Sequence, residues 1–251
     1  MRNATLFALV VALTTTSSSV VQAARESTPQ VAPQLTVRVY DMTKVPAADQ
    51  TVALRAAAGV LAAAGIQTAW VVCSSDTAAA GCEAPLAGTE ISVRLARLPA
   101  EPNGHGMLQL GYSLVNTQAG AGTLATMFVD RVEWLANQAG ADAATVLGFA
   151  IAHEIGHLLL GTNAHAASGL MRAVWSRHEL QHARTKDWLF LAKEASRMRT
   201  ALVEREGLKF SQHNPNASGC AASDDDAAGG ATGCRSTASA AALRGVAAGG
   251  D

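Results

Sequence analysis

Residues 152–165 read Ala-His-Glu-Ile-Gly-His-Leu-Leu-Leu-Gly-Thr-Asn-Ala-His. His153 and His157 are four residues apart, so on a helix their imidazoles lie on one face and can share a tetrahedral metal ion. Glu154 is turned away from that axis, where a carboxylate can take a proton from water as a general base. This spacing predicts a zinc site of the catalytic kind.

The sequence around these residues predicts how the site is held. The apolar run 143–151 indicates a buried helix, and Asp142 is suited to be its N-cap. Gly161 can take the left-handed conformation that ends a helix and turns the chain back. Catalytic zinc usually has three protein ligands and one open position, and His165 is the nearest candidate for the third ligand.

Met171 follows His165 by six residues, and together these residues resemble the metzincin zinc metallopeptidases, most nearly the matrixin-like group. The family pattern is HExxHxxGxxH followed by a methionine turn beneath the zinc. Here the pattern diverges to HExxHxxxGxxxH, and Asn163 stands at the family's position for the third ligand. The distance from His153 to Met171 is nevertheless 18 residues, as in matrixins. The resemblance implies that Met171 forms the methionine turn.

The resemblance also implies a fold and an activity. The fold is α+β: a twisted mixed sheet of four to five strands, a backing helix, an active-site helix and a small helical C-terminal subdomain. The activity is hydrolysis of protein or peptide substrates, which would lie extended along an edge strand at 108–115. A non-catalytic, exported zinc-binding protein on the same scaffold is the alternative. The displaced His165 favours this alternative, and the intact Glu154 argues against it.

A second HExxH pattern occurs at 178–182. Charged residues surround it, and no helix-ending glycine, third histidine or methionine follows at a useful spacing. The sequence therefore predicts a solvated helix face here. Glu179 is also a candidate for the third zinc ligand, contributed by a later helix, but His165 is preferred.

The N-terminus and the cysteines indicate export. Residues 1–23 combine one positive charge, a short apolar core and small residues before Ala24, as in a cleaved signal peptide. Two close cysteine pairs, Cys73 with Cys82 and Cys220 with Cys234, favour disulfides over a cysteine zinc site because neither pair has CxxC spacing. A secreted or periplasmic protein is expected, without stable membrane insertion once the signal is removed.

Charge and periodicity set the remaining expectations. A net charge of −1 and a pI near 6.6 give no indication of a nucleic-acid partner. The predicted metallopeptidase domain covers 24–206, divided into 24–165 and a helical part, 166–206. The Gly-, Ala- and Ser-rich residues 207–251 are expected to be disordered. Within the domain, apolar patterning predicts strands at 35–40, 68–73, 90–95, 108–115 and 125–129, helices at 47–64 and 130–138, and two helices within 177–205.

Overall fold

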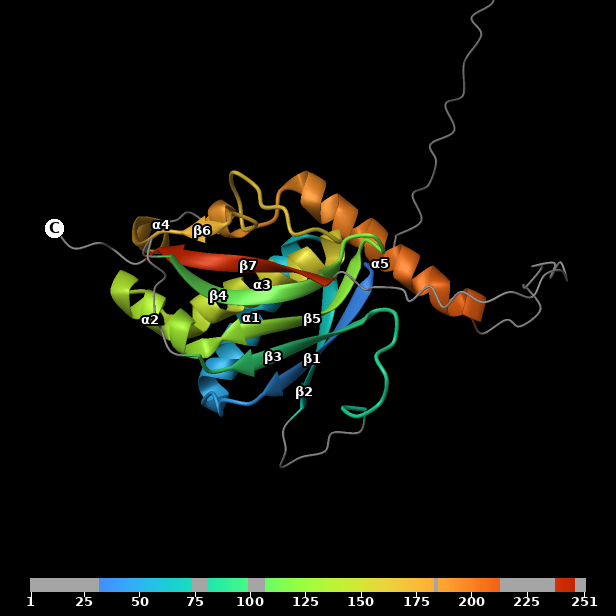
Figure 1. Ribbon diagram of the computed structural model, residues 1–251, viewed down its shortest axis with the longest axis horizontal. Helices are drawn as coiled ribbons and strands as arrows, with labels where there is room; N and C mark the ends of the chain where they lie inside the picture. The colour runs from blue at the N-terminus through green and yellow to red at the C-terminus, as the bar shows by residue number, and fades with distance from the viewer. Residues whose placement is uncertain (1–31, 74–80, 99–106, 183–184, 213–237, 247–251) are drawn as a thin grey trace, which may run out of the picture. The chain divides into compact units, whose positions relative to one another are not determined.

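The computed structural model describes residues 32–73, 81–98, 107–182, 185–212 and 238–246 (Figure 1). These residues belong to one unit that begins at residue 32. The elements are β1 (Gln34–Asp41), α1 (Ala47–Ala63), β2 (Gln67–Cys73), β3 (Glu90–Ala96), β4 (Met107–Asn116), β5 (Ala121–Phe128), α2 (Val129–Ala139), α3 (Ala143–Leu160), β6 (Val174–Trp175), α4 (Arg177–His182), a 3-10 turn η1 (Thr185–Trp188), α5 (Ala192–Gln212) and β7 (Ala238–Val246).

The strands form one mixed sheet in the order β2-β1-β3-β5-β4-β7-β6. β1 pairs in parallel with β2 and β3, and β3 pairs in parallel with β5, whereas β4 runs antiparallel to β5. Buried and partly exposed residues alternate along β3, which is the pattern of a strand with one face on the core. The predicted mixed sheet of up to five strands, backed by helices, is therefore confirmed for β1–β5. β6 and β7 extend it.

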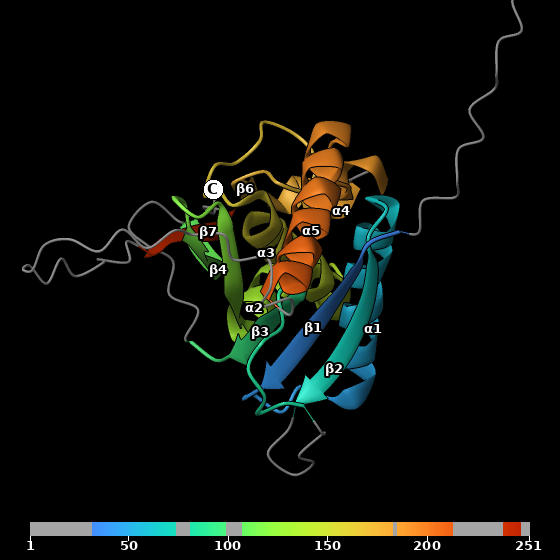
Figure 2. The same cartoon turned by 90° about the vertical axis from the view of Figure 1, so that its right-hand side faces the viewer.

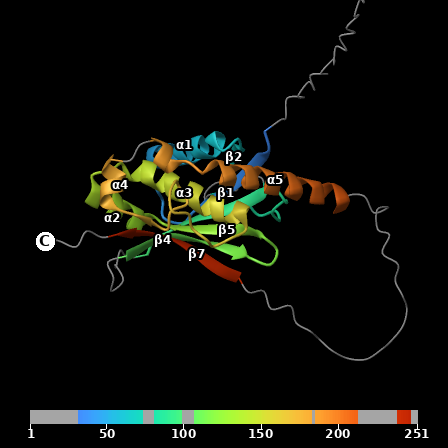
Figure 3. The same ribbon diagram turned by 90° about the horizontal axis from the view of Figure 1, so that it is seen from above.

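Two helices, α1 and α3, cover the same face of the sheet (Figures 1 and 3). They approach unusually closely: a β-carbon added at Gly148 of α3 would collide with the carbonyl oxygen of Ala53 and lie 2.6 Å from the Ala56 β-carbon in α1. The alanines that dominate α1 thus allow the two backbones to come into near contact. Such packing fixes α3, which carries the histidines, as a rigid element.

α3 is also the one helix in the described residues that is long and apolar enough to cross a membrane. Its 18-residue window is 78% buried inside the fold. Length and apolar composition here reflect a central core helix, because a helix that is apolar on all sides needs protein around it.

The helices after Met171 follow the predicted pattern, with α4 and α5 separated by η1. α5 crosses the C-terminal end of α3 (Figure 2). There Arg205 Nη2 donates to the carbonyl oxygen of Leu158 at 2.7 Å, and Arg197 Nη2 to that of Leu160 at 3.4 Å. Cations are favourable at this end of a helix, because its last carbonyls lack intrahelical partners. The boundary at 165/166 stays a prediction.

Two segments of the tail that the sequence predicts to be disordered have regular secondary structure. α5 continues through Gln212, and residues 238–246 form β7, which pairs with the outer side of β4. The small residues of this segment gave no apolar alternation, but main-chain hydrogen bonds to a neighbouring strand do not require one. Consequently β4 is not an edge strand in this structure. Residues 213–237 and 247–251 lie outside the described residues.

One predicted disulfide is present, between Cys73 at the end of β2 and Cys82. A disulfide of this kind is typical of proteins in an oxidising, extracytoplasmic compartment. The predicted pair Cys220 and Cys234 and the predicted signal peptide, 1–23, lie outside the described residues.

Candidate metal centre

The ends of α3 are fixed by the residues that the sequence singled out. Asp142 caps the N-terminus, where its carboxylate accepts a hydrogen bond from Thr145 N at 2.8 Å. Gly161 ends the helix in the left-handed conformation, with φ of 63°, and its N–H donates to the carbonyl oxygen of His157. A β-carbon at Gly161 would collide with the main chain of Gly120 in the turn between β4 and β5. Only glycine fits both requirements, and the chain then turns back toward α3.

This turn brings His165 to the two helical histidines. The Nε2 atom of His157 lies 3.0 Å from Nε2 of His153 and 3.3 Å from Nε2 of His165. These three side chains are the one group of three or more His, Cys, Asp or Glu residues in the described part of the chain that could hold a metal ion. Zn–N bonds of about 2.0–2.1 Å in a tetrahedral site place two ligand nitrogens about 3.3 Å apart. The donor set therefore fits zinc.

Hydrogen bonds to the main chain orient two of the rings. His153 Nδ1 donates to the carbonyl oxygen of Leu170 at 2.8 Å, and His157 Nδ1 donates to that of Thr162 at 2.8 Å. A carbonyl can only accept, so each Nδ1 carries the proton and each Nε2 keeps its lone pair. These carbonyls thus select the tautomer that presents Nε2 to a metal and hold the rings in place.

Burial also keeps these imidazoles neutral. His153 is fully buried, and removal from water is the main reason that its pKa lies well below the usual 6.5, with His157 nearby adding to the effect. The pKa of His157 is lowered to about 4, again chiefly by burial. Both side chains are therefore uncharged near neutral pH, which is the form that coordinates a metal.

Glu154 is fully buried beside the histidines, and Ser113 of β4 is its partner. The Ser113 hydroxyl lies 2.6 Å from Glu154 Oε2 and 2.8 Å from the Glu154 main-chain oxygen. A hydroxyl has a single proton, so it donates to one of these oxygens at a time. When it donates to the main chain, its own oxygen can accept from a protonated carboxyl group. Ser113 can therefore form a hydrogen bond with the Glu154 carboxyl group both before and after Glu154 takes up a proton.

Ser113 lies outside the motifs that predict the metal site, although the sequence carries a signal for it. Along β4 the buried positions include Val115, Ser113 and Gly111, so a serine occupies a core-facing place in an otherwise apolar alternation. A polar residue at such a position needs a hydrogen-bond partner. What cannot be read from the strand alone is that the partner lies on α3.

We expect Ser113→Ala to lower kcat by roughly tenfold to hundredfold, because a hydrogen bond to a charged group is worth about 1.5–3 kcal/mol. Zinc content and KM should stay near the parent values, while the pH dependence of kcat should change. Metal analysis measures the zinc content, and steady-state peptide hydrolysis across pH measures kcat, KM and the pH dependence. Ser92→Ala is the matched control, since Ser92 lies on β3 between the buried residues Ile91 and Val93, so its side chain is on the opposite face of the sheet from theirs. An unaltered pH profile for Ser113→Ala would contradict this role.

Met171 packs against α3, the helix that carries His153 and His157. It is buried, and a β-carbon at Gly156 would lie 2.6 Å from Met171 Sδ, so Gly156 leaves the space that the methionine fills. Ala166 N donates to the carbonyl oxygen of Met171 at 2.8 Å, which closes the loop that follows His165. The next residue back, Leu170, supplies the carbonyl that orients His153. The segment at Met171 therefore supports two of the three histidines.

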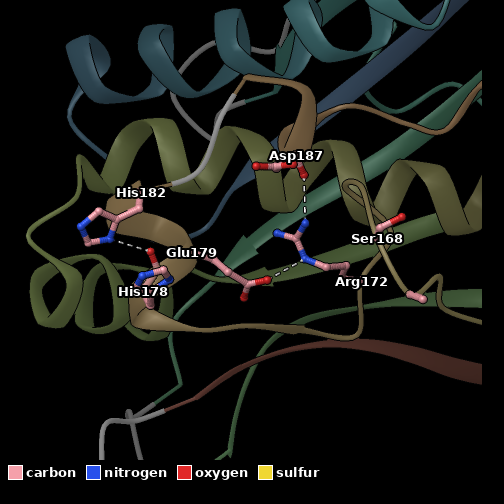
Figure 4. Close-up of a pocket in the computed structure, with 7 residues that line it drawn as sticks. Ser168, Arg172, His178, Glu179, His182 and Asp187 are labelled. Atoms are coloured by element: carbon pink, nitrogen blue, oxygen red, sulfur yellow. Dashed lines mark hydrogen bonds and ion pairs between the residues drawn. The ribbon is translucent and has the colours of Figure 1, made fainter.

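The second HExxH pattern has a structural explanation (Figure 4). Glu179 Oε2 accepts from both N and Oγ of Ser176, and Glu179 N donates back to Ser176 Oγ, which is a capping box at the start of α4. Its other oxygen, Oε1, pairs with Arg172 Nε at 3.2 Å. His178 and His182 line an open pocket of about 490 Å³ on this side. Glu179 is thus held by its own helix cap and by Arg172.

Asn163 remains the other alternative for the third ligand position. Its Oδ1 atom is buried and has no hydrogen-bond partner within the described residues. His165 instead presents an imidazole nitrogen to His157 at a distance suited to a shared ion. Imidazole is a far better zinc ligand than a side-chain amide.

Comparison with known proteins gives only distant structural likenesses. No family model matches the sequence, and no curated protein matches it. The crystal structure of a zinc-dependent peptidase from Methanocorpusculum labreanum is 15% identical with a TM-score of 0.43, and the match covers 64% of this chain and 99% of that one. Metalloproteinase-II from Bacteroides fragilis is 12% identical with a TM-score of 0.37, covering 68% and 53%. At such values the activity has to be derived from the site itself.

Proposed function

We propose that this chain is an exported zinc-dependent endopeptidase in which His153, His157 and His165 hold the metal and Glu154 is the general base. The observation that supports it best is the convergence of three imidazole Nε2 atoms beside a buried carboxylate. Three neutral nitrogen ligands leave one tetrahedral position open, as in catalytic rather than structural zinc sites.

The residues of the site then have distinct parts in peptide hydrolysis. Bound zinc supplies Lewis acidity, which brings the pKa of water to about 7 and polarises a carbonyl group. Glu154 takes the proton from the attacking water and can deliver it to the leaving amine. Ser113 holds the Glu154 carboxyl group in place in either protonation state. The carbonyls of Leu170 and Thr162 keep the imidazoles in the ligand tautomer.

Export is part of the proposal. It is supported by the Cys73–Cys82 disulfide and by the signal-like composition of 1–23. Met171 is proposed as the methionine turn, because it packs at Gly156 beneath the helix that bears the histidines.

Metal analysis together with hydrolysis of casein tests this function. We expect one zinc per chain and cleavage that stops with a chelator such as 1,10-phenanthroline and returns when zinc is added back. The internal control is the same protein with the chelator present throughout. Stoichiometric zinc without any chelator-sensitive cleavage, even on prolonged incubation, would favour the non-catalytic zinc-binding alternative.

A further inference from the structure

β7 lies in the sheet between β4 and β6 (Figures 1 and 3). On one side it runs antiparallel to β4, with Met107 opposite Val246 and Asn116 opposite Ala238. On the other side it runs parallel to β6, the short strand that follows Met171, with Trp175 opposite Gly245. Both main-chain sides of β7 are therefore engaged at its C-terminal end.

The register places β7 directly along the catalytic residues. Ala241 lies opposite Ser113, whose hydroxyl contacts Glu154. Gly245 lies opposite Trp175, whose ring stands edge-on to that of His153 with the ring centres 5.9 Å apart. The backbone from Ala241 to Gly245 thus passes from the side of the general base to the side of a metal ligand.

An extended substrate would need the main-chain groups that β7 occupies. Peptides bind beside such sites by adding a strand to an open sheet edge, where main-chain hydrogen bonds supply much of the affinity. The open edge nearest Glu154 would be the outer side of β4, and β7 fills it. His153 and Glu154 are both 0% exposed in the structure that has β7 paired to β4. A substrate that added its own strand to the outer side of β4 would have to displace β7.

We propose that residues 238–246 are an autoinhibitory strand that occupies the substrate groove of the same chain; this rests on the endopeptidase function proposed above. A tethered segment acts at an effective concentration in the millimolar range, so even weak strand pairing competes with dilute substrates. Four of its nine residues are alanine. The partners that the structure gives for this strand are main-chain pairings with β4 and β6, and another extended peptide can replace such pairings.

The test uses the full, zinc-loaded chain with Ala240→Pro and Ala241→Pro combined. N–H groups of adjacent strand residues point to opposite sides, so the double change removes a donor to β4 whichever residue provides it. Ala240→Ser with Ala241→Ser is the matched control, because it keeps both N–H groups and nearly the same volume. Hydrogen exchange of α3 shows whether each variant keeps the fold.

Three measurements are compared for the parent, the proline variant and the serine control. The proline variant should exchange β4 amides faster. It should bind a fluorescently labelled peptide of sequence ASAAALRGV that the other two proteins do not bind. Its kcat/KM for a generic fluorogenic peptide should rise about tenfold, equivalent to about 1.4 kcal/mol in favour of the docked strand.

The outcomes separate this inference from the proposed function. Equal β4 exchange in the parent and the proline variant would show that the strand is not docked, and equal kcat/KM in three active proteins would show that it does not block the site; either result overturns the inference. If none of the proteins cleaves peptide, the endopeptidase function fails. The peptide-binding measurement then decides. If the proline variant binds the labelled peptide and the parent and serine control do not, the result supports occupation of the substrate site by residues 238–246. Equal binding by all three proteins refutes it.

Discussion

Glu154→Gln is expected to keep its zinc and lose peptide hydrolysis by roughly 10²–10⁴-fold, the contribution typical of a general base. The change replaces one carboxylate oxygen by an amide and nearly preserves the shape of the side chain. Since Glu154 is fully buried and its partner is the Ser113 hydroxyl, an isosteric amide can stay in the same place. Zinc content by metal analysis and single-turnover peptide cleavage measure the two effects separately.

Glu179→Gln provides the matched control, because Glu179 occupies the same place in the second HExxH pattern. Its carboxylate caps α4 through Ser176 and pairs with Arg172, so its loss should cost about 1 kcal/mol of stability and leave kcat unchanged. Full activity in Glu154→Gln, or loss of activity in Glu179→Gln with zinc retained, would contradict Glu154 as the general base.

Where the sequence predicted this structure well, the determinants were local. Asp142 and Gly161 mark the ends of α3 through chemistry that acts within one helical turn, so both could be assigned without knowing the fold. The strands β1 to β4 and helix α1 were also predicted close to their observed bounds, because apolar patterning has the period of the element that it builds. The start of β5 was missed, since Gly122 weakens the pattern there.

The features that sequence reasoning missed depend on contacts between distant residues. Ser113 and Glu154 are 41 positions apart, and only the packing of α3 on the sheet makes them partners. The pairing of β7 with β4 joins segments separated by more than 120 residues, and the alanines of β7 carry no pattern that indicates it. Composition predicted disorder for that segment, because low side-chain hydrophobicity says nothing of main-chain pairing.

The docked strand also bears on how the burial of the site is interpreted. A fully buried Glu154 could indicate a site that never meets substrate, as in the non-catalytic alternative. The position of β7 offers a different reason, since the outer side of β4 is covered by residues of the same chain. Under the autoinhibition proposed above, a buried Glu154 is compatible with hydrolysis once the strand has moved.

His165→Ala should weaken zinc binding by more than roughly 100-fold. Loss of an outer hydrogen-bond partner of a metal ligand weakens binding by up to about 100-fold, and loss of the ligand itself should weaken it further. The reason is geometric: His165 Nε2 lies 3.3 Å from that of His157, and the loop that carries it is closed by the hydrogen bond from Ala166 to Met171. Zinc titration against a competing chelator measures the loss.

Asn163→Ala and Glu179→Ala are the controls for this assignment, because each removes one alternative third ligand. Asn163 has a buried Oδ1 without a hydrogen-bond partner among the described residues, so it is the stronger of these two alternative ligands. Both variants should bind zinc within about tenfold of the parent, as expected when no ligand of the ion is lost. If His165→Ala bound zinc like the parent while Asn163→Ala did not, the third ligand would be the asparagine, and the two extra residues around Gly161 would have shifted His165 out of the site.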